Sequence, residues 1–493
     1  MRGKQCIRLF YNRSRTDVDM TQGTIFSHLL RFAVPLLLGN LFQQLYNVAD
    51  AWVVGNHVSN SAFSAVGSVT PVINLLIGFF MGLSNGTGVV IAQHYGARRY
   101  DLVREAVHTA FAMTLLLSVI FTAVGIWMIP AMLRLMKTPA AVWPHCQEYL
   151  TIYFAGVTGL LLYNMGASTL QAVGNSRYPF LCLAACTLTN IALDLLLVIR
   201  YGMGIRGVAY ATVIAQLVSA ALVVWKLLRT DSCVKLELRC LAFRGEQLRR
   251  ILQIGLPAAL QMAITAFSNV FIQSYINVFG EDCMSGWTAY SKVDHLILLP
   301  ITSLGLATTT FVGQNLGKRQ TERARKGMHT ALWMAEASTV ITAAAVCAAA
   351  PALVAFFNDK AEVVRIGSMF LRWLTPFYVF GAVNHVVAGA LRGAGDSRTP
   401  LAIFMIAYVG ARQLYFYIVA HWISNTVLPV SMGYPFGWIT CAALLLICQR
   451  VKGPWAPSGE REPEALRQPA PNSCKSIAES GKTAMKGTEN HET

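Results

Sequence analysis

Long apolar stretches dominate this chain of 493 residues and leave few ways for it to fold. Charged residues make up only 13% of the sequence, whereas soluble domains carry roughly a quarter. A helix needs about 20 apolar residues to cross the hydrocarbon core of a bilayer. We therefore expect an all-α polytopic membrane protein with twelve transmembrane helices, at roughly 29–54, 62–93, 105–129, 147–171, 179–199, 205–228, 250–278, 287–315, 327–350, 366–391, 400–421 and 427–449.

Lys and Arg residues gather in alternate connections between these stretches. The arm before residue 29 and the connections at 94–104, 226–250 and 316–326 are rich in them, whereas 55–61, 279–286 and 422–426 contain none. Short loops with many Lys and Arg residues stay in the cytoplasm, so both termini are predicted to be cytoplasmic. This bias accounts for the formal charge of +16, and a nucleic-acid partner is not needed to explain it.

Two sequence segments occur twice, at a spacing of about 221 residues. "AQHYGARR" at 92–99 aligns with "GQNLGKRQ" at 313–320, and "LQAVGNSRYP" at 170–179 aligns with "LRGAGDSRTP" at 391–400. The predicted halves each hold six helices, an even number, so both enter the membrane from the same side. This is a parallel repeat, which places a substrate path between two bundles and allows alternating access by rocking.

The repeat and the changes in composition divide the chain into five regions. The tail is rich in Pro, Ser, Glu and Lys without periodicity and is predicted to be disordered. The arm is polar, so we expect no cleavable signal peptide, and translation can start at Met1 or at Met20. The predicted regions are a cytoplasmic arm at 1–28, a six-helix lobe at 29–228, a cytoplasmic linker at 229–249, a second six-helix lobe at 250–451 and a cytoplasmic tail at 452–493.

Several segments are similar to one family of membrane proteins. They are "PLLLGNLFQQLYNVADAWVVG" at 35–55, "GNSRYP", "GDSRTP", "TNIALD" at 189–194, "RGVAYATVIAQ" at 206–216 and "YSKVDHLILLP" at 290–300. Over about 25–450 the chain resembles the multidrug and toxic compound extrusion (MATE) family. This resemblance implies a secondary antiporter in the cell inner membrane that exports cationic or amphipathic compounds in exchange for H⁺ or Na⁺. It also implies a monomer without a cofactor.

Ionisable residues inside a membrane are costly and usually functional. The apolar stretches contain Asp50, Asp194, Asp294 and Glu336, and near their ends Glu105, Arg372 and Arg412. Counting from the cytoplasmic ends, Asp50 and Asp194 lie roughly 20–30 Å deep, and Thr212 lies at a similar level. Asn190 precedes Asp194 by four residues and so shares its helix face.

By the resemblance, the first half holds the cation or proton site, made by Asp50, Asn190, Asp194 and Thr212, with Asn164 placed nearer the cytoplasm. A low-dielectric environment favours the neutral form of a carboxyl group, and a second carboxylate nearby favours it further, so such a pair can exchange a proton or a cation. The alternative is that Asp194 and Asn190 only hold neighbouring helices together. The expected cavity-lining residues are Gln43, Tyr46, Asn47, Gln261, Asn269 and Asp294, and pairing of Asp294 with Lys292 is an alternative role.

The second half departs from another branch of the family. Thr265 and Gly381 stand where that branch carries the carboxylates of a sodium site, which favours proton coupling here without settling it. A lipid-linked saccharide flippase would need a strongly cationic cavity, and a channel or receptor would need no acidic site in one lobe. Export of an endogenous metabolite stays open. The GxGxxG motif at 202–207 lies in an expected turn rather than after a strand, so a nucleotide-binding enzyme is not indicated. The cysteines form no CxxC pair, so a metal site is not indicated either.

Overall fold

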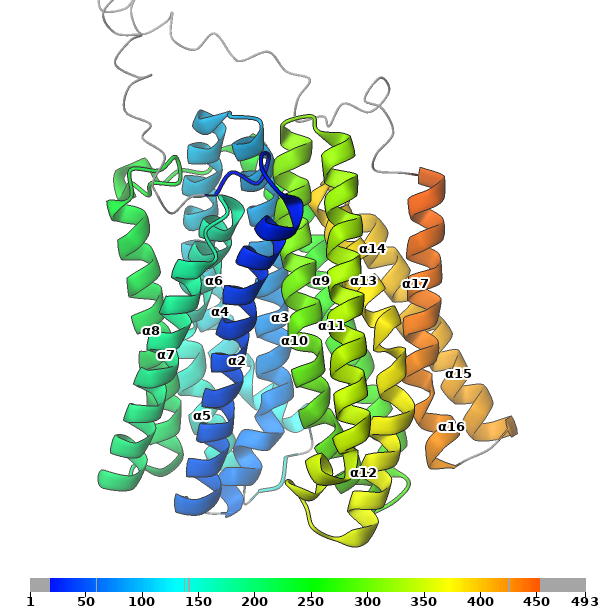
Figure 1. Ribbon diagram of the computed structural model, residues 1–493. Helices are drawn as coiled ribbons and strands as arrows, with labels where there is room; N and C mark the ends of the chain where they lie inside the picture. Colours follow the sequence, from blue (N-terminus) through cyan, green and yellow to red (C-terminus); the bar gives the residue numbers. More distant parts are fainter. Residues whose placement is uncertain (1–17, 59, 137, 141, 424–425, 453–493) are drawn as a thin grey trace, which may run out of the picture. The chain divides into compact units, whose positions relative to one another are not determined.

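The computed structural model describes residues 18–58, 60–136, 138–140, 142–423 and 426–452 (Figure 1). Most of the predicted arm and all but the first residue of the predicted tail lie outside these residues. All regular structure in the described part of the chain is helical, as predicted.

Seven α-helices lie among the described residues of the first half. They are α2 (Ile25–His57), α3 (Asn60–Gly96), α4 (Tyr100–Leu135), α5 (Trp143–Ala155), α6 (Val157–Ala172), α7 (Arg177–Asp194), which continues into the π-helix η1 (Leu195–Arg200), and α8 (Gly204–Arg229).

The second half follows a short 3-10 helix, η2 (Leu238–Cys240). It contains α9 (Gly245–Asn277), α10 (Glu281–Gly317), α11 (Thr321–Ala355), α12 (Ala361–Leu374), the 3-10 helix η3 (Thr375–Phe377), α13 (Tyr378–Gly393), α14 (Arg398–Phe404), the π-helix η4 (Met405–Ala411), α15 (Arg412–Ile418), the π-helix η5 (Val419–Ile423), α16 (Val427–Ser431) and α17 (Gly433–Lys452).

Ten stretches among the described residues are helical, long and apolar enough to cross a membrane, and α5 with α6 makes an eleventh if this bent pair is one span. The remaining predicted span coincides with α9. This helix has 33 residues.

The span predicted at 147–171 is bent rather than a single straight helix. The chain breaks at Gly156, where α5 and α6 meet at an angle of 47°. A Cβ atom at Gly156 would lie 2.2 Å from Cγ1 of Val213 on α8, so only glycine allows this close approach. The predicted helix at 366–391 is likewise interrupted, by η3, because Pro376 cannot donate a helical hydrogen bond.

The structure confirms the internal repeat at the level of the backbone. The helices α3, α4 and α7 begin at residues 60, 100 and 177, and α10, α11 and α14 begin at residues 281, 321 and 398. The turns repeat as well. Arg98 and Arg319 both have positive φ angles (57° and 62°), and so do Gly174 and Gly395 (87° and 91°). The halves therefore share one backbone plan.

The two halves pack against each other through equivalent helices. α3 packs along α9, and its repeat equivalent α10 packs against α2. Glycines make the first of these contacts close. A Cβ atom at Gly82 would lie 2.4 Å from Cα of Ala259, and one at Gly86 would lie 2.2 Å from Cα of Gly255. Small residues of this kind allow helix backbones to approach closely in a membrane.

Reciprocal hydrogen bonds join the halves at the end of the bundle that carries the linker, which we call the linker end. Nε2 of Gln93 on α3 donates to the carbonyl of Gly393 at 2.9 Å, and Nε2 of Gln314 on α10 donates to the carbonyl of Ala172 at 2.8 Å. The repeat relates Gln93 to Gln314 and Ala172 to Gly393. The linker end is therefore closed by the same contact made twice, once from each half.

Residues Val18–Gly23, which we call the N-terminal strap, cross this closed end. The backbone N–H of Val18 donates to the carbonyl of Val173 at 3.1 Å. The backbone N–H of Met20 donates to Oε1 of Gln314 at 3.0 Å, and its carbonyl accepts from Nη2 of Arg323 at 3.2 Å. The strap thus touches both halves.

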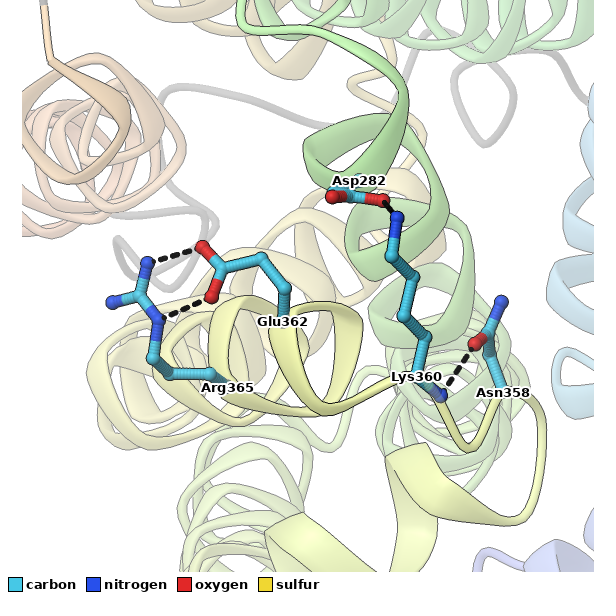
Figure 2. Close-up of polar contacts among 5 residues, drawn as sticks. All are labelled: Asp282, Asn358, Lys360, Glu362 and Arg365. Carbon is cyan, nitrogen blue, oxygen red and sulfur yellow. Dashed lines mark hydrogen bonds and ion pairs between the residues drawn. The ribbon is translucent and has the colours of Figure 1, made fainter.

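At the opposite end, the ion pairs found among the described residues each stay within one half. In the first half, Arg206 of α8 pairs with Glu148 of α5. In the second half, Nζ of Lys360 lies 2.5 Å from Oδ1 of Asp282, at the start of α10, and this hydrogen bond raises the pKa of Lys360 (Figure 2). Figure 2 also shows Arg365 and Glu362 paired on α12. The Arg206–Glu148 and Lys360–Asp282 pairs join neighbouring segments of one half, the Arg365–Glu362 pair lies within one helix, and none of the three links the halves.

Candidate functional site

Two polar residues of the first half lie buried where an α-helix changes to a π-helix. Asp194 is the last residue of α7, and η1 begins at the next residue. Asp194 is 0% exposed, and Asn190, one turn earlier on the same face, is 1% exposed. π-helical segments occur frequently at functional sites, because they change which side chains a helix presents to its neighbours.

Neighbouring helices add two more side chains. α2 and α8 both pack against α7. The carboxyl group of Asp50, on α2, interacts with the side chains of Asp194, Asn190 and Thr212, the last of which is on α8. The structure therefore brings together four of the five residues of the expected cation site. The count of residues from the cytoplasmic ends had placed Asp50, Asp194 and Thr212 at a similar depth, because the rise per residue is nearly constant along a helix.

Most polar atoms of this cluster lack a hydrogen bond of normal geometry. Five atoms are buried and make no such hydrogen bond among the described residues. They are Oδ1 of Asp50, both carboxyl oxygens of Asp194, and both polar atoms of the Asn190 amide. The hydroxyl of Thr212 donates to the carbonyl of Val208 at 3.0 Å, which leaves its oxygen able to accept. Buried polar atoms are normally satisfied, so these convergent oxygens can take up a proton or an oxygen-coordinated cation.

Among the described residues, no Lys or Arg side chain interacts with either carboxyl group. Two ionised carboxylates in a low-dielectric surrounding would repel each other strongly. Neutralisation by one bound proton or cation removes this repulsion. The cluster is thus suited to binding a positive charge.

The sequence did not point to Tyr149 and Tyr153, which lie beside this cluster on α5. Tyr149 interacts with Asp50 and Thr212, and its ring stacks on that of Tyr153, with centroids 6.4 Å apart. Their spacing of four residues places them on one helix face, which was the available signal. The break of the helix at Gly156 could not be predicted from this spacing, because it depends on contact with α8.

The other residues expected in the first half lie around the cluster or away from it. Tyr46 interacts with both Asp50 and Gln43. Nδ2 of Asn164 donates to the carbonyl of Leu160 in its own helix at 2.8 Å, and the structure does not bring Asn164 to the carboxyl pair. Asn47 is exposed, and its amide donates to Gln44 at 3.4 Å.

The expected cavity residues of the second half divide between two basic side chains and one tyrosine pair. Gln261 accepts a hydrogen bond from Nη1 of Arg392 at 3.3 Å, and Asn269 accepts one from Nη2 of Arg412 at 3.4 Å. Asp294 interacts with Tyr290 and Tyr434, and its Oδ1 is buried without a hydrogen bond. Lys292 is exposed, and the ion pairs of the described residues do not join it to Asp294.

Arg412, which the sequence placed near the end of a span, is buried inside the protein. The side chain is 1% exposed and is the largest fully buried one among the described residues. It follows η4 directly, inside the span Arg398–Ile418. A guanidinium in such a place is unusual, because burial of a charge in a membrane protein is costly.

Duplicated helices long enough to span a bilayer, closed at one end and carrying a buried carboxyl pair in one half, define a two-lobed membrane transporter. The chain belongs to the MatE family, whose sequence profile matches residues 35–196 and 257–418. The profile matches twice, once in each half, which confirms the duplication independently. Members of this family are transporters rather than enzymes.

Similar proteins support the same assignment. A probable multidrug resistance protein, YpnP, from Bacillus subtilis is 28% identical over 427 residues, covering 87% of this chain and 96% of that one. A probable multidrug resistance protein, NorM, from Thermotoga maritima is 23% identical over 447 residues, covering 90% of this chain and 94% of that one.

Solved structures have the same fold. An outward-facing multidrug resistance MATE family transporter of the MOP superfamily superposes with a TM-score of 0.84 at 25% identity, covering 90% of this chain and 98% of that chain. A MOP superfamily transporter from Pyrococcus furiosus, described as having a binding pocket of reverse polarity, gives the same values.

Proposed function

We propose that this protein is a secondary antiporter that exports cationic or amphipathic small molecules in exchange for H⁺ or Na⁺. The observation that carries the proposal is the contact between the carboxyl groups of Asp50 and Asp194. Oδ1 of Asp50 and both carboxyl oxygens of Asp194 are buried and make no hydrogen bond of normal geometry among the described residues. The names of the relatives from Bacillus subtilis and Thermotoga maritima, which describe probable multidrug resistance proteins, support the same class of substrate.

In this mechanism the coupling ion and the substrate compete for one negative charge. A cationic substrate that enters from the cytoplasm neutralises the ionised pair, and a proton or sodium ion from the outside displaces it. Asp50 and Asp194 hold the exchanging charge, Asn190 and Thr212 supply neutral oxygens, and Tyr149 lies beside the pair. A conformational change between inward-facing and outward-facing states then carries each ligand in one direction.

The closed linker end fits the outward-facing half of this cycle. The Lys and Arg bias predicts that this end lies in the cytoplasm, together with both termini. An outward-facing state in the cell inner membrane is the one in which an external proton must reach the carboxyl pair. We further propose two lobes that work within a monomer, without a cofactor.

Protons are favoured over sodium ions as the coupling ion. The second half has Thr265 and Gly381 where a sodium-binding branch has carboxylates, and the Thr265 hydroxyl is engaged with the carbonyl of Gln261 at 2.9 Å. Exchange would then depend on the first half alone.

Export of an endogenous metabolite is a second candidate. A relative from Shewanella oneidensis named as an FAD transporter is 22% identical over 308 residues, covering 61% of this chain and 67% of that one. FAD is anionic, and the buried Arg412 offers a positive group that a purely cationic substrate would not need. A lipid-linked saccharide flippase is less favoured, because the carboxyl pair gives the first half an acidic site.

Reconstitution in liposomes tests the proposal. Ethidium movement would be followed by fluorescence under an imposed pH gradient and, separately, an imposed sodium gradient. We expect the wild-type protein to move ethidium against its gradient when protons flow in the opposite direction, and Asp50→Asn to lose this coupling. Asp231→Asn, which removes an exposed carboxylate in the linker, is the matched control and should behave as wild type. Full coupling in Asp50→Asn, or no response of the wild-type protein to either gradient, would contradict the proposal.

A further inference from the structure

Arg412 lacks an acidic partner among the described residues. Its guanidinium donates from Nη2 to Oγ of Ser268 and to Oδ1 of Asn269, both of which are neutral. The rings of Tyr408 and Tyr434 lie 4.7 and 5.2 Å from its central carbon atom. Cation–π contacts and neutral hydrogen bonds offset part of the cost of burial, but none of them supplies the opposite charge.

The Nε–H group of this guanidinium is buried and makes no hydrogen bond among the described residues. An arginine side chain presents its donors as a planar fork, and a carboxylate that approaches the edge of this fork accepts from Nε and an adjoining Nη together. A buried, unpaired Nε–H therefore marks the edge at which an anionic group would complete the coordination.

The position of the side chain is fixed by its surroundings. The hydroxyl of Ser268 donates to the carbonyl of Tyr408 at 2.7 Å, so its oxygen is oriented to accept from Arg412. A Cβ atom at Gly437, on α17, would lie 2.9 Å from Cδ of Arg412, so this helix packs directly against the side chain. Preorganisation of this kind lowers the entropy lost when a ligand binds.

Aromatic rings surround the same place. The ring of Tyr434 lies 5.6 Å from that of Trp438, which in turn lies 4.7 Å from Tyr378. Oδ1 of Asn384, whose amide donates to the carbonyl of Trp438, is a further buried acceptor without a partner. Flat aromatic faces beside a charged fork are suited to an aromatic molecule that carries an anionic group.

We propose that Arg412, with Tyr408 and Tyr434, forms a subsite in the second lobe that binds the carboxylate of a zwitterionic aromatic substrate. The positive part of such a molecule is attracted by the acidic side chains Asp50, Asp194 and Asp294. A purely cationic substrate makes no use of the arginine. This inference rests on the proposed export function and specifies which amphipathic molecules the second lobe recognises.

Two probes that differ only at the carboxylate test the subsite. Norfloxacin carries a carboxylate and an amine on an aromatic ring system, and its methyl ester lacks the anionic group. We expect norfloxacin to raise the thermal unfolding temperature of the purified wild-type protein, whereas the ester at equal concentration raises it less. This measurement needs no variant, so it stands even if a substitution at a buried arginine prevents folding.

Transport by variants gives the second arm. Arg412→Lys keeps the charge but removes the planar fork, and we expect its KM for norfloxacin to rise about tenfold, equivalent to one strong hydrogen bond, while its KM for ethidium stays within about twofold. Arg372→Lys, at an exposed position on α12, is the matched control and should change neither value.

The outcomes separate this inference from the proposed function. Equal losses for norfloxacin and ethidium in Arg412→Lys, or equal binding of norfloxacin and its ester, would overturn the subsite, even with ethidium exchange intact. Failure of the wild-type protein to exchange either compound under any gradient would instead overturn the antiporter itself.

Discussion

The two halves of this transporter share a backbone plan and differ in the charge that they bury. In the first half, Asp194 ends α7 where η1 begins; in the second half, Arg412 begins α15 where η4 ends. Both groups lie in the fifth predicted span of their half, and each adjoins a π-helical segment. The comparison teaches that duplication preserved the order of the helices and their turns, whereas the π-helical segments and the buried charges of this span differ between the halves.

The largest expected effect is a loss of ion coupling when a carboxyl group of the first half, but not of the second half, is neutralised. Asp194→Asn should abolish ion-driven ethidium accumulation, because one member of the pair that exchanges the charge is then permanently neutral. Asp294→Asn should retain ion coupling within about twofold, since Asp294 contacts tyrosines rather than a second carboxyl group. Proteoliposome transport under an imposed pH gradient measures both. Equal loss of coupling in the two variants would break the division of labour between the halves.

The glycines that close the linker end should respond symmetrically. A Cβ atom at Gly96 would lie 1.9 Å from the carbonyl oxygen of Gln314, and one at Gly317 would lie 2.1 Å from that of Gln93. We expect Gly96→Ala and Gly317→Ala each to destabilise the closed state by about 1–3 kcal/mol through overpacking. Thermal unfolding in detergent measures this.

Gly245→Ala is the control for these variants, because a Cβ atom there meets no other atom within 4 Å. A loss confined to Gly96→Ala or to Gly317→Ala would show that the closed end is not used equally by the two halves.

The smallest expected effect is a difference in stability between variants of Gln93 and of its repeat equivalent Gln314. Gln93 donates to one carbonyl, whereas Gln314 also accepts from the backbone N–H of Met20 in the strap. Gln314→Ala should therefore be less stable than Gln93→Ala by about 1 kcal/mol, the net value of one hydrogen bond. Removal of Val18–Gly23 should erase this difference. A difference that survives the deletion would show that the strap is not its cause.

Much of this organisation could be predicted from the sequence. Hydropathy predicted the positions of most membrane spans, and the repeated motifs predicted the division into two halves. The predicted depths of Asp50, Asp194 and Thr212 indicated that three helices meet at one site, because the rise per residue is nearly constant along a helix. These features depend on local pattern alone.

The remaining features depend on contacts between distant segments. Tyr149 reaches the carboxyl pair from a short helix that breaks at Gly156, against Val213. Arg412 is buried by helices whose positions no count along the chain can supply. The role of Gln314 depends on Met20, 294 residues earlier. Patterns within one span carry no information about such partners.

The N-terminal strap sets an order for the biogenesis of this protein. Its partners Gln314, Asn315 and Arg323 follow it by 294 to 303 residues. At ribosomal rates of about 5–20 residues per second, the strap waits roughly 15–60 s before they are synthesised. Until then the first lobe has no partner for Gln93 and no anchor for Met20. A nascent chain that stops before α10 therefore cannot seal this end. The strap docks only after α10 has been made, and Gln93 waits longer still, for Gly393.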